Sequence, residues 1–157
     1  MNETRRTVLK AGGGASLLTL LAAAGWLVPG TAAAQAWNKS AFEAKNMDET
    51  MKAFGGGAPA QSKDIAFVST PDIAENGAVV PIGVSSSIPK TESIAILIEK
   101  NPNMLAASFD IPAGTEPSIS TRVKMGQSSN VYALVKADGK YYVASKEIKV
   151  TLGGCGG

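Results

Sequence analysis

The chain of 157 residues contains no histidine and only one cysteine, Cys155. The absence of histidine excludes catalytic sites of the Ser-His-Asp and Cys-His types, together with zinc, copper and non-haem iron sites that depend on imidazole ligands. A single cysteine excludes an internal disulfide, a dithiol redox motif and the usual iron–sulfur clusters. We therefore expect no catalytic residue, no metal and no cofactor, and a fold that rests on packing alone.

Two further functional classes find no support in the sequence. The carboxylates form no pair whose spacing indicates acid–base catalysis, so we interpret them as solvated surface or turn groups. The glycine-rich stretch at residues 55–63 lacks the second glycine directly before Lys63 that a phosphate-binding loop requires. We therefore expect no nucleotide site.

The single cysteine lies among the last five residues, Gly153, Gly154, Cys155, Gly156 and Gly157. Glycine adds no side-chain bulk and accepts both signs of φ, so residues 153–157 are expected to form a thin, mobile arm. Three residues beyond the body would hold the sulfur about 10 Å away from it. The segment contains no cation that would lower the pKa of the thiol, which favours a covalent carrier activated by other proteins over an enzyme.

The N-terminus has the pattern of an export signal. Arg5 and Arg6 precede a stretch rich in Ala, Gly and Leu at residues 11–28, and small residues follow at 32–36. This order is typical of a twin-arginine signal, so we expect residues 1–36 to be removed after Ala34 or Ala36 and the mature protein to reach the periplasm. A retained membrane anchor is the alternative, since about 18 apolar residues can just span a bilayer. The high glycine content and the small-residue site favour removal.

Loss of the signal changes the charge of the protein. The precursor has 15 basic and 13 acidic residues, and the mature part keeps 12 of each. No basic patch remains that would indicate binding to nucleic acid or to an anionic membrane. We therefore expect neither nucleic acid nor membrane as a partner once the chain is processed.

The mature chain is predicted to be a mainly β protein. Residues 37–57 are expected to form one short helix, because Ser40 and Glu43 have the spacing of a capping box and glycines follow at 55–57. This helix either packs on the domain or contacts a partner. Residues 58–152 are expected to form an immunoglobulin-like antiparallel β-sandwich of about seven strands. The predicted strands lie near 64–70, 78–86, 92–99, 105–111, 117–125, 130–137 and 140–151.

Two local patterns support this β architecture. Asp138-Gly139 lies between two runs rich in Val and Tyr and is the strongest hairpin signal in the chain. Apolar and polar residues alternate over 118–125, which is typical of a strand with one buried and one solvated face.

Several segments together resemble the SoxY family, the sulfur-carrying subunits of the bacterial thiosulfate-oxidising Sox system. They are the twin-arginine signal, the helix sequence Ala-Phe-Glu-Ala-Lys at 41–45, the segments 71–81, 99–102 and 121–125, and the terminus Gly-Gly-Cys-Gly-Gly. The resemblance covers the whole chain. It implies that Cys155 is the site of covalent sulfur attachment and that this chain is not itself an enzyme.

The resemblance also implies partners. A SoxZ-like small β subunit would form a heterodimer with this chain and be exported with it. A SoxAX-like cytochrome would join thiosulfate to Cys155, a SoxB-like manganese hydrolase would release sulfate, and a SoxCD-like dehydrogenase would oxidise the remaining sulfane sulfur. The resemblance leaves open which sulfur species predominates and which face binds the partner subunit.

Two alternative functions remain at this point. The chain could be a structural or interaction β-sandwich domain whose terminal cysteine forms an intermolecular disulfide. It could also carry sulfur on its terminal carboxylate, as ubiquitin-like proteins do, although that chemistry consumes ATP and the strand order lacks the long helix of that fold.

Overall fold

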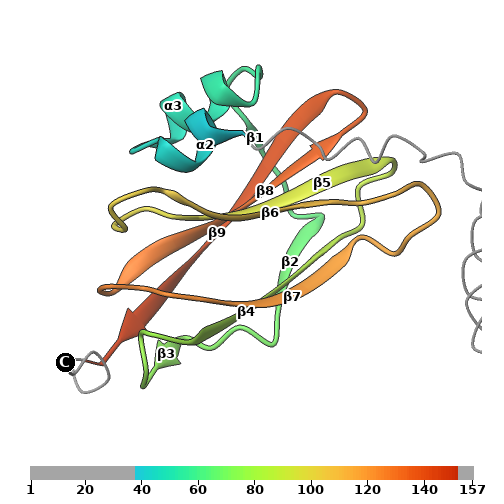
Figure 1. Cartoon of the computed structure of the whole chain (residues 1–157). Helices are drawn as coiled ribbons and strands as arrows, with labels where there is room; N and C mark the ends of the chain where they lie inside the picture. The colour runs from blue at the N-terminus through green and yellow to red at the C-terminus, as the bar shows by residue number, and fades with distance from the viewer. Residues whose placement is uncertain (1–37, 152–157) are drawn as a thin grey trace, which may run out of the picture. The chain divides into compact units, whose positions relative to one another are not determined.

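The structure, a computed structural model, describes residues 38–151, which form two helices and nine strands in three layers (Figure 1). The helices are α2 (Lys39–Glu43) and α3 (Met47–Ala53). The strands are β1 (Ala60–Gln61), β2 (Ile65–Val68), β3 (Ile73–Ala74), β4 (Val80–Ser86), β5 (Thr91–Ile98), β6 (Leu105–Asp110), β7 (Ser118–Val123), β8 (Ser129–Ala137) and β9 (Lys140–Val150). The expected export signal at 1–36 and the expected arm at 153–157 lie outside the described residues, so both assignments and the domain boundaries remain predictions.

The strands form two sheets, and this confirms the predicted β-sandwich. The larger sheet has the order β1-β9-β8-β5-β6, with β3 also paired to β9, and the smaller sheet has the order β2-β4-β7. Seven strands correspond to the seven predicted runs. The other two, β1 and β3, are two residues long and pair in parallel with β9, so the expectation of purely antiparallel pairing is wrong at these two places.

The main core lies between the two sheets. The central strand β5 directs Ile94, Ile96 and Ile98 toward the smaller sheet, while Ala95 and Leu97 face the helices. All five side chains are buried. Burial on both faces explains why this strand is a continuous apolar run and not an alternating one.

The single helix predicted for residues 37–57 is wrong, because two separate helices occupy this region. Asn38 and Asn46 each begin a helix, since their side-chain oxygens accept hydrogen bonds from the backbone N–H groups of Ala41 (3.1 Å) and Glu49 (2.9 Å). The capping box predicted from Ser40–Glu43 is therefore also wrong. Asparagine competes well for the cap position, and two such residues start two short helices where one was expected.

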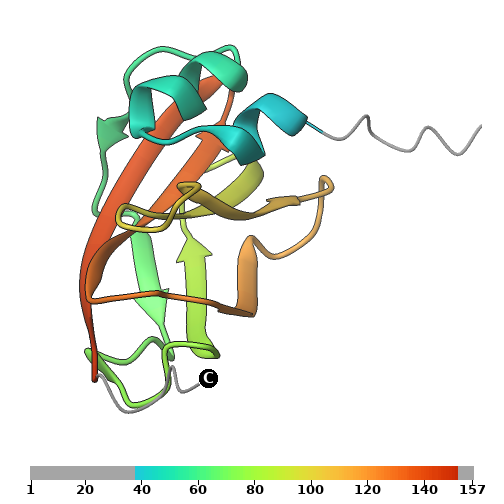
Figure 2. The ribbon, with the colours of Figure 1, turned by 60° about the vertical axis from the view of Figure 1, so that its left-hand side comes forward.

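Both helices cover the outer face of the larger sheet (Figure 2). Met51 is buried in this second layer of the core. The ring of Phe54 stacks on that of Tyr141 with the ring centres 6.3 Å apart, and the Tyr141 hydroxyl donates to the Phe54 carbonyl over 3.1 Å. Gly56 lies so close to this tyrosine ring that a Cβ there would overlap it. Of the two interpretations for this region, packing on the domain is the one the structure shows.

The predicted hairpin at Asp138-Gly139 is confirmed. Both residues have positive φ, 48° and 72°, as a two-residue type I′ turn requires. Ala137 pairs with Lys140, so β8 and β9 are in register from the turn onward. The hairpin fixes one end of β9, and the opposite end of β9 leads to the segment that carries Cys155.

Candidate functional site

The last described residues form the base of the expected arm, and residues 149–151 are called the arm root below. On one edge of the root, Lys149 N donates to the Asp72 carbonyl (2.9 Å) and Thr151 N donates to the Ala74 carbonyl (3.0 Å). These bonds continue the parallel pairing of β3 with β9. The short strand β3 therefore holds the chain up to the last residue before Leu152.

The other edge of the arm root is held by Ser128. Its hydroxyl oxygen accepts a hydrogen bond from Val150 N (2.9 Å), and the same hydroxyl lies 3.5 Å from the Val150 carbonyl. Strand β8 begins only at Ser129, so no backbone partner is in register with Val150 on that edge. A serine side chain takes the place of a backbone partner, which is how buried strand ends keep their polar groups paired.

Three loops meet around the arm root. They are the β2–β4 connection at 69–79, the β5–β6 connection at 99–104 and the β7–β8 connection at 124–128. The Thr151 hydroxyl donates to the Glu75 carbonyl (3.4 Å), and Met125 N donates to the Gly77 carbonyl (2.7 Å). Figure 1 shows β3 beside the end of β9 and near the start of β4.

The side-chain amide of Asn101 joins the β5–β6 connection to the β7–β8 connection. Asn101 Nδ2 donates to the Lys124 carbonyl (2.8 Å), and Asn101 Oδ1 accepts from Gly126 N (3.3 Å). The amide thus uses both its donor and its acceptor, and it fixes the loop that carries Ser128. The arm root is therefore part of one connected hydrogen-bond network.

Lys146, on β9, makes further contacts with the β2–β4 connection. Its Nζ donates to the Thr70 carbonyl (2.6 Å) and forms an ion pair with Asp72 Oδ1 (3.0 Å). The Asp72 carboxylate is largely exposed, so the ion pair itself contributes little. The hydrogen bond to the carbonyl, made by a partly buried lysine, is the contact that holds residues 70–72 against the strand.

The fixed root limits where Cys155 can act. Thr151 and Cys155 are four Cα–Cα steps apart, and a fully extended chain of that length spans at most about 14 Å. Whatever reacts with the thiol must therefore come within that distance of Thr151.

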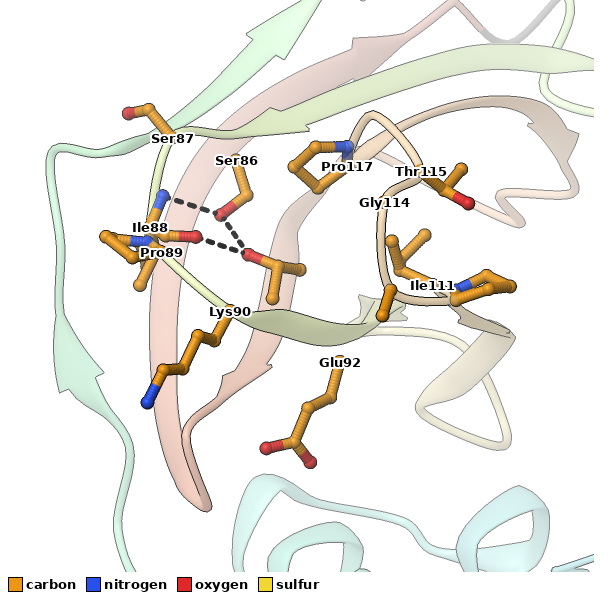
Figure 3. Close-up of a pocket in the computed structure, with 13 residues that line it drawn as sticks. Ser86, Ser87, Ile88, Pro89, Lys90, Glu92, Ile111, Gly114, Thr115 and Pro117 are labelled. Atoms are coloured by element: carbon orange, nitrogen blue, oxygen red, sulfur yellow. Dashed lines mark hydrogen bonds between the residues drawn. The ribbon is translucent and has the colours of Figure 1, made fainter.

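A hollow (Figure 3) lies at the opposite end of the sandwich. It has a volume of about 660 Å³ and lies between the β4–β5 and β6–β7 connections. Two of its hydroxyl groups are paired within the hollow: the Ser86 and Thr91 hydroxyls lie 3.0 Å apart, and Thr91 donates to the Ile88 carbonyl (2.8 Å). Thr91 pairs with Ala137 next to the hairpin, so the length of β9, about 33 Å, separates this hollow from the root. Cys155 of the same chain cannot reach it.

A second hollow, of about 460 Å³, lies beside the link between the helices. Tyr132 and Glu99 line it, and the tyrosine hydroxyl donates to Glu99 Oε1 (3.4 Å). Partial burial raises the pKa of Tyr132, and the neighbouring Glu99 carboxylate adds to this rise. The tyrosine therefore stays neutral in the physiological range and serves as a hydrogen-bond donor.

Other pKa changes in the described region belong to surface contacts. The Glu92 carboxylate accepts from Lys136 and from Gly139 N, and both bonds lower its pKa, while the same contact raises the pKa of Lys136. The pKa of Glu49 is lowered chiefly because its carboxylate accepts from the backbone N–H of Lys45. None of these groups lies at the arm root.

Residues 38–151 contain no group of three or more carboxylate, cysteine or histidine side chains arranged to hold a metal ion. Within the same range, no helix is long and apolar enough to cross a membrane.

The residues predicted from the sequence to carry function lie outside the described part of the chain. They are Cys155, Gly153, Gly154, Gly156, Gly157, Arg5 and Arg6. The structure instead identifies the residues that hold the arm root, which the sequence analysis did not single out. The only available signal was the resemblance itself, because segments 71–81, 99–102 and 121–125 lie in or beside the three loops at the root.

Comparison with known proteins places the chain in a family. The model of the family described as sulfur oxidation protein SoxY matches residues 50–155, a range that ends at the single cysteine. The chain belongs to the SoxY family. A comparison with curated proteins found no match.

A SoxY structure has the same fold as this chain. The sulfur carrier protein SoxY from Chlorobium limicola f thiosulfatophilum is 39% identical, with a TM-score of 0.60, and the match covers 67% of this chain and 96% of that one. The reeler domain of human F-spondin is 9% identical with a TM-score of 0.40, covering 61% and 94% of the two chains. That second similarity is too low to support an inference. The SoxY family therefore accounts for both the fold and the sequence, and it places the chain among proteins of sulfur oxidation.

Proposed function

We propose that this protein is a periplasmic sulfur carrier that holds thiosulfate-derived sulfur on Cys155 and presents it to partner enzymes. Membership of the SoxY family supports this role, and the related SoxY structure is described as a sulfur carrier protein. The twin-arginine pattern at Arg5 and Arg6 supports export to the periplasm.

The chemistry begins with an oxidation. The Cys155 thiol and thiosulfate form a sulfur–sulfur bond, which gives a cysteine S-thiosulfonate and releases one proton and two electrons. The electrons go to the haem of a SoxAX-type cytochrome. Water then cleaves the bond to the terminal sulfonate in a SoxB-type manganese hydrolase, which releases sulfate and protons and leaves a cysteine persulfide. A SoxCD-type dehydrogenase, where present, oxidises the persulfide sulfur.

The chain itself supplies attachment and presentation in this sequence of reactions. The thiol receives no activating cation from its own segment, since the nearest basic residue in the sequence is Lys149. The glycines on either side of Cys155 minimise the width of the segment that must enter each partner's active site. A SoxZ-type subunit completes the carrier as a heterodimer.

The observation that carries the proposal is the geometry of the arm root. Thr151 is fixed by β3 on one edge, and Val150 is fixed by Ser128 on the other, so the cysteine is displayed four residues beyond a defined point. The described residues of the domain offer no reactive group of their own near that point. This arrangement is the one expected of a carrier, whose reactive atom is separated from a rigid body by a short segment.

Intact mass spectrometry tests the proposal. The mature protein is incubated with thiosulfate and a SoxAX-type cytochrome, and we expect an adduct of the mass of thiosulfate that maps to Cys155. The variant Cys155→Ser should acquire none. A wild-type protein that stays unmodified, or an adduct that persists in Cys155→Ser, would contradict the proposal. Gel mobility with and without reductant separates the carrier from a domain whose thiol only forms an intermolecular disulfide.

A further inference from the structure

Two exposed hydrophobic side chains lie beside the arm root. Among residues 38–151, the large hydrophobic side chains with high exposure are Ile73 at 57%, Val79 at 51% and Val68 at 40%. Ile73 lies on β3 and pairs with Lys149 of the root. Val79 lies in the turn just after Glu75, where its N–H donates to the Asn76 carbonyl (3.3 Å).

Both side chains are close to Thr151. Strand spacing and residue rise place the Cα of Ile73 about 8 Å from that of Thr151. Val79 is joined to Thr151 through the Glu75 carbonyl and one tight turn, so their Cα atoms lie at most about 16 Å apart. Ile73 therefore lies within the span of about 14 Å that an extended chain from Thr151 to Cys155 covers, and Val79 lies no more than about 2 Å beyond it.

The shortness of the arm determines what must cover this surface. An enzyme pocket that surrounds Cys155 lies at most about 14 Å from Thr151, so the rim of that pocket meets the carrier body at the root. A protein interface of standard size covers about 800 Å² on each partner, which is a disc of about 16 Å radius. Centred on the root, such a disc contains Ile73 and reaches Val79.

We propose that Ile73 and Val79 form the apolar centre of a docking surface for the entrance rim of the cytochrome that loads Cys155. This inference rests on the proposed carrier function. The exposed charges around the two hydrophobic residues are mixed, since Lys149, paired with Ile73, and Lys124, next to the Val80–Val123 pair, are matched by Asp72 and Glu75. The partner surface that fits is therefore an apolar rim without a strong charge of one sign.

Steady-state kinetics of loading tests this surface. The mature protein, purified with its partner subunit, serves as the varied substrate for thiosulfate and a SoxAX-type cytochrome. The double variant Ile73→Thr/Val79→Thr removes apolar surface while keeping the β-branched shape that suits a strand. Val68→Thr is the matched control, because Val68 is similarly exposed but lies on β2, and not on β3 or in the turn at 76–79.

We expect the double variant to raise the KM for the carrier about tenfold, with kcat and the rate of Cys155 alkylation by iodoacetamide unchanged. The control variant should keep the wild-type KM. A KM within twofold of wild type in the double variant, or an equal rise in Val68→Thr, would overturn the inference. Loss of the co-purifying subunit from the double variant would also overturn it, because the surface would then face that subunit. Failure of the carrier function itself is distinguishable, since wild-type protein would then acquire no adduct at all.

Discussion

Removal of the Ser128 hydroxyl should loosen the arm root without disturbing the core. In Ser128→Ala, the N–H of Val150 loses the partner that accepts its hydrogen bond over 2.9 Å. The N–H groups of Lys149 and Thr151 keep their bonds to the Asp72 and Ala74 carbonyls on the other edge. Hydrogen exchange of these two amides therefore measures how often the arm root opens, and it does not measure the deleted contact itself.

The size of the effect follows from the bonds that are lost. One good hydrogen bond contributes about 1 kcal/mol net, and the longer contact to the Val150 carbonyl contributes less. A loss of about 1.4 kcal/mol makes opening about tenfold more frequent. We expect hydrogen exchange at Lys149 and Thr151 to be about tenfold faster, while exchange at Val135 in the buried centre of β8 stays unchanged. Gln127→Ala, which truncates an exposed neighbour in the same loop, is the control.

The consequence for loading is small and calculable. Full release back to the buried Ile148 would lengthen the tether to Cys155 from four Cα–Cα steps to seven. The effective concentration of a tethered group falls roughly as the −3/2 power of tether length, so loading by the cytochrome should fall by no more than about twofold. Exchange at Thr151 that is the same in Ser128→Ala and wild type would refute the role given to Ser128. A tenfold loss of loading without faster exchange would show that the serine acts by another route.

Three further predictions concern the arm, the hairpin and the acid limit of stability. Gly154→Val should slow loading and unloading of Cys155 without changing the urea midpoint, and equal turnover would show that the glycine is incidental. Gly139→Ala should lower the free energy of unfolding by about 1–2 kcal/mol in urea titrations, because a residue with a Cβ must then adopt a φ of 72°. Glu92 has a lowered pKa because Lys136 and Gly139 N donate to it, so its contribution to stability is complete above pH 4.5 and is lost as the pH falls through the lowered value. Unfolding free energy measured against pH should therefore fall less steeply in Glu92→Gln over that acid range, and identical slopes would contradict this assignment.

Strong local signals predicted the body of the fold. The Asp138-Gly139 turn and the alternation in β7, where Arg122 is exposed and Val123 is buried, depend only on neighbouring residues, and the structure confirms both. Strands β1 and β3 were missed because two residues are too few to show a period of two. The break between α2 and α3 was missed because a cap at Asn46 competes with helix continuation, and that balance depends on packing against the larger sheet.

At the candidate site, one residue could be singled out from the sequence and the residues that hold the arm root could not. Cys155 stays a prediction from the sequence, made because it is the only cysteine of the chain and lies among glycines. Ser128 could not be singled out, since its contact with Val150 joins residues 22 positions apart and exists only once β8 and β9 are paired. The double use of the Asn101 amide likewise depends on two loops that meet only in the folded protein.

The arm root also explains why a resemblance to SoxY extends beyond the terminal glycines. Segments 71–81, 99–102 and 121–125 are far apart in the sequence, yet each lies in or beside a loop at the end of the sandwich where β9 ends. Under the proposed carrier function, a chain of at most about 14 Å between Thr151 and Cys155 cannot compensate for a displaced Thr151 by reaching further. On the same proposal, the position of Thr151 on the body decides which face of the protein meets each enzyme. Residues that hold Thr151 and Val150 in place, such as Ser128 and Asn101, then help to position the sulfur for those enzymes.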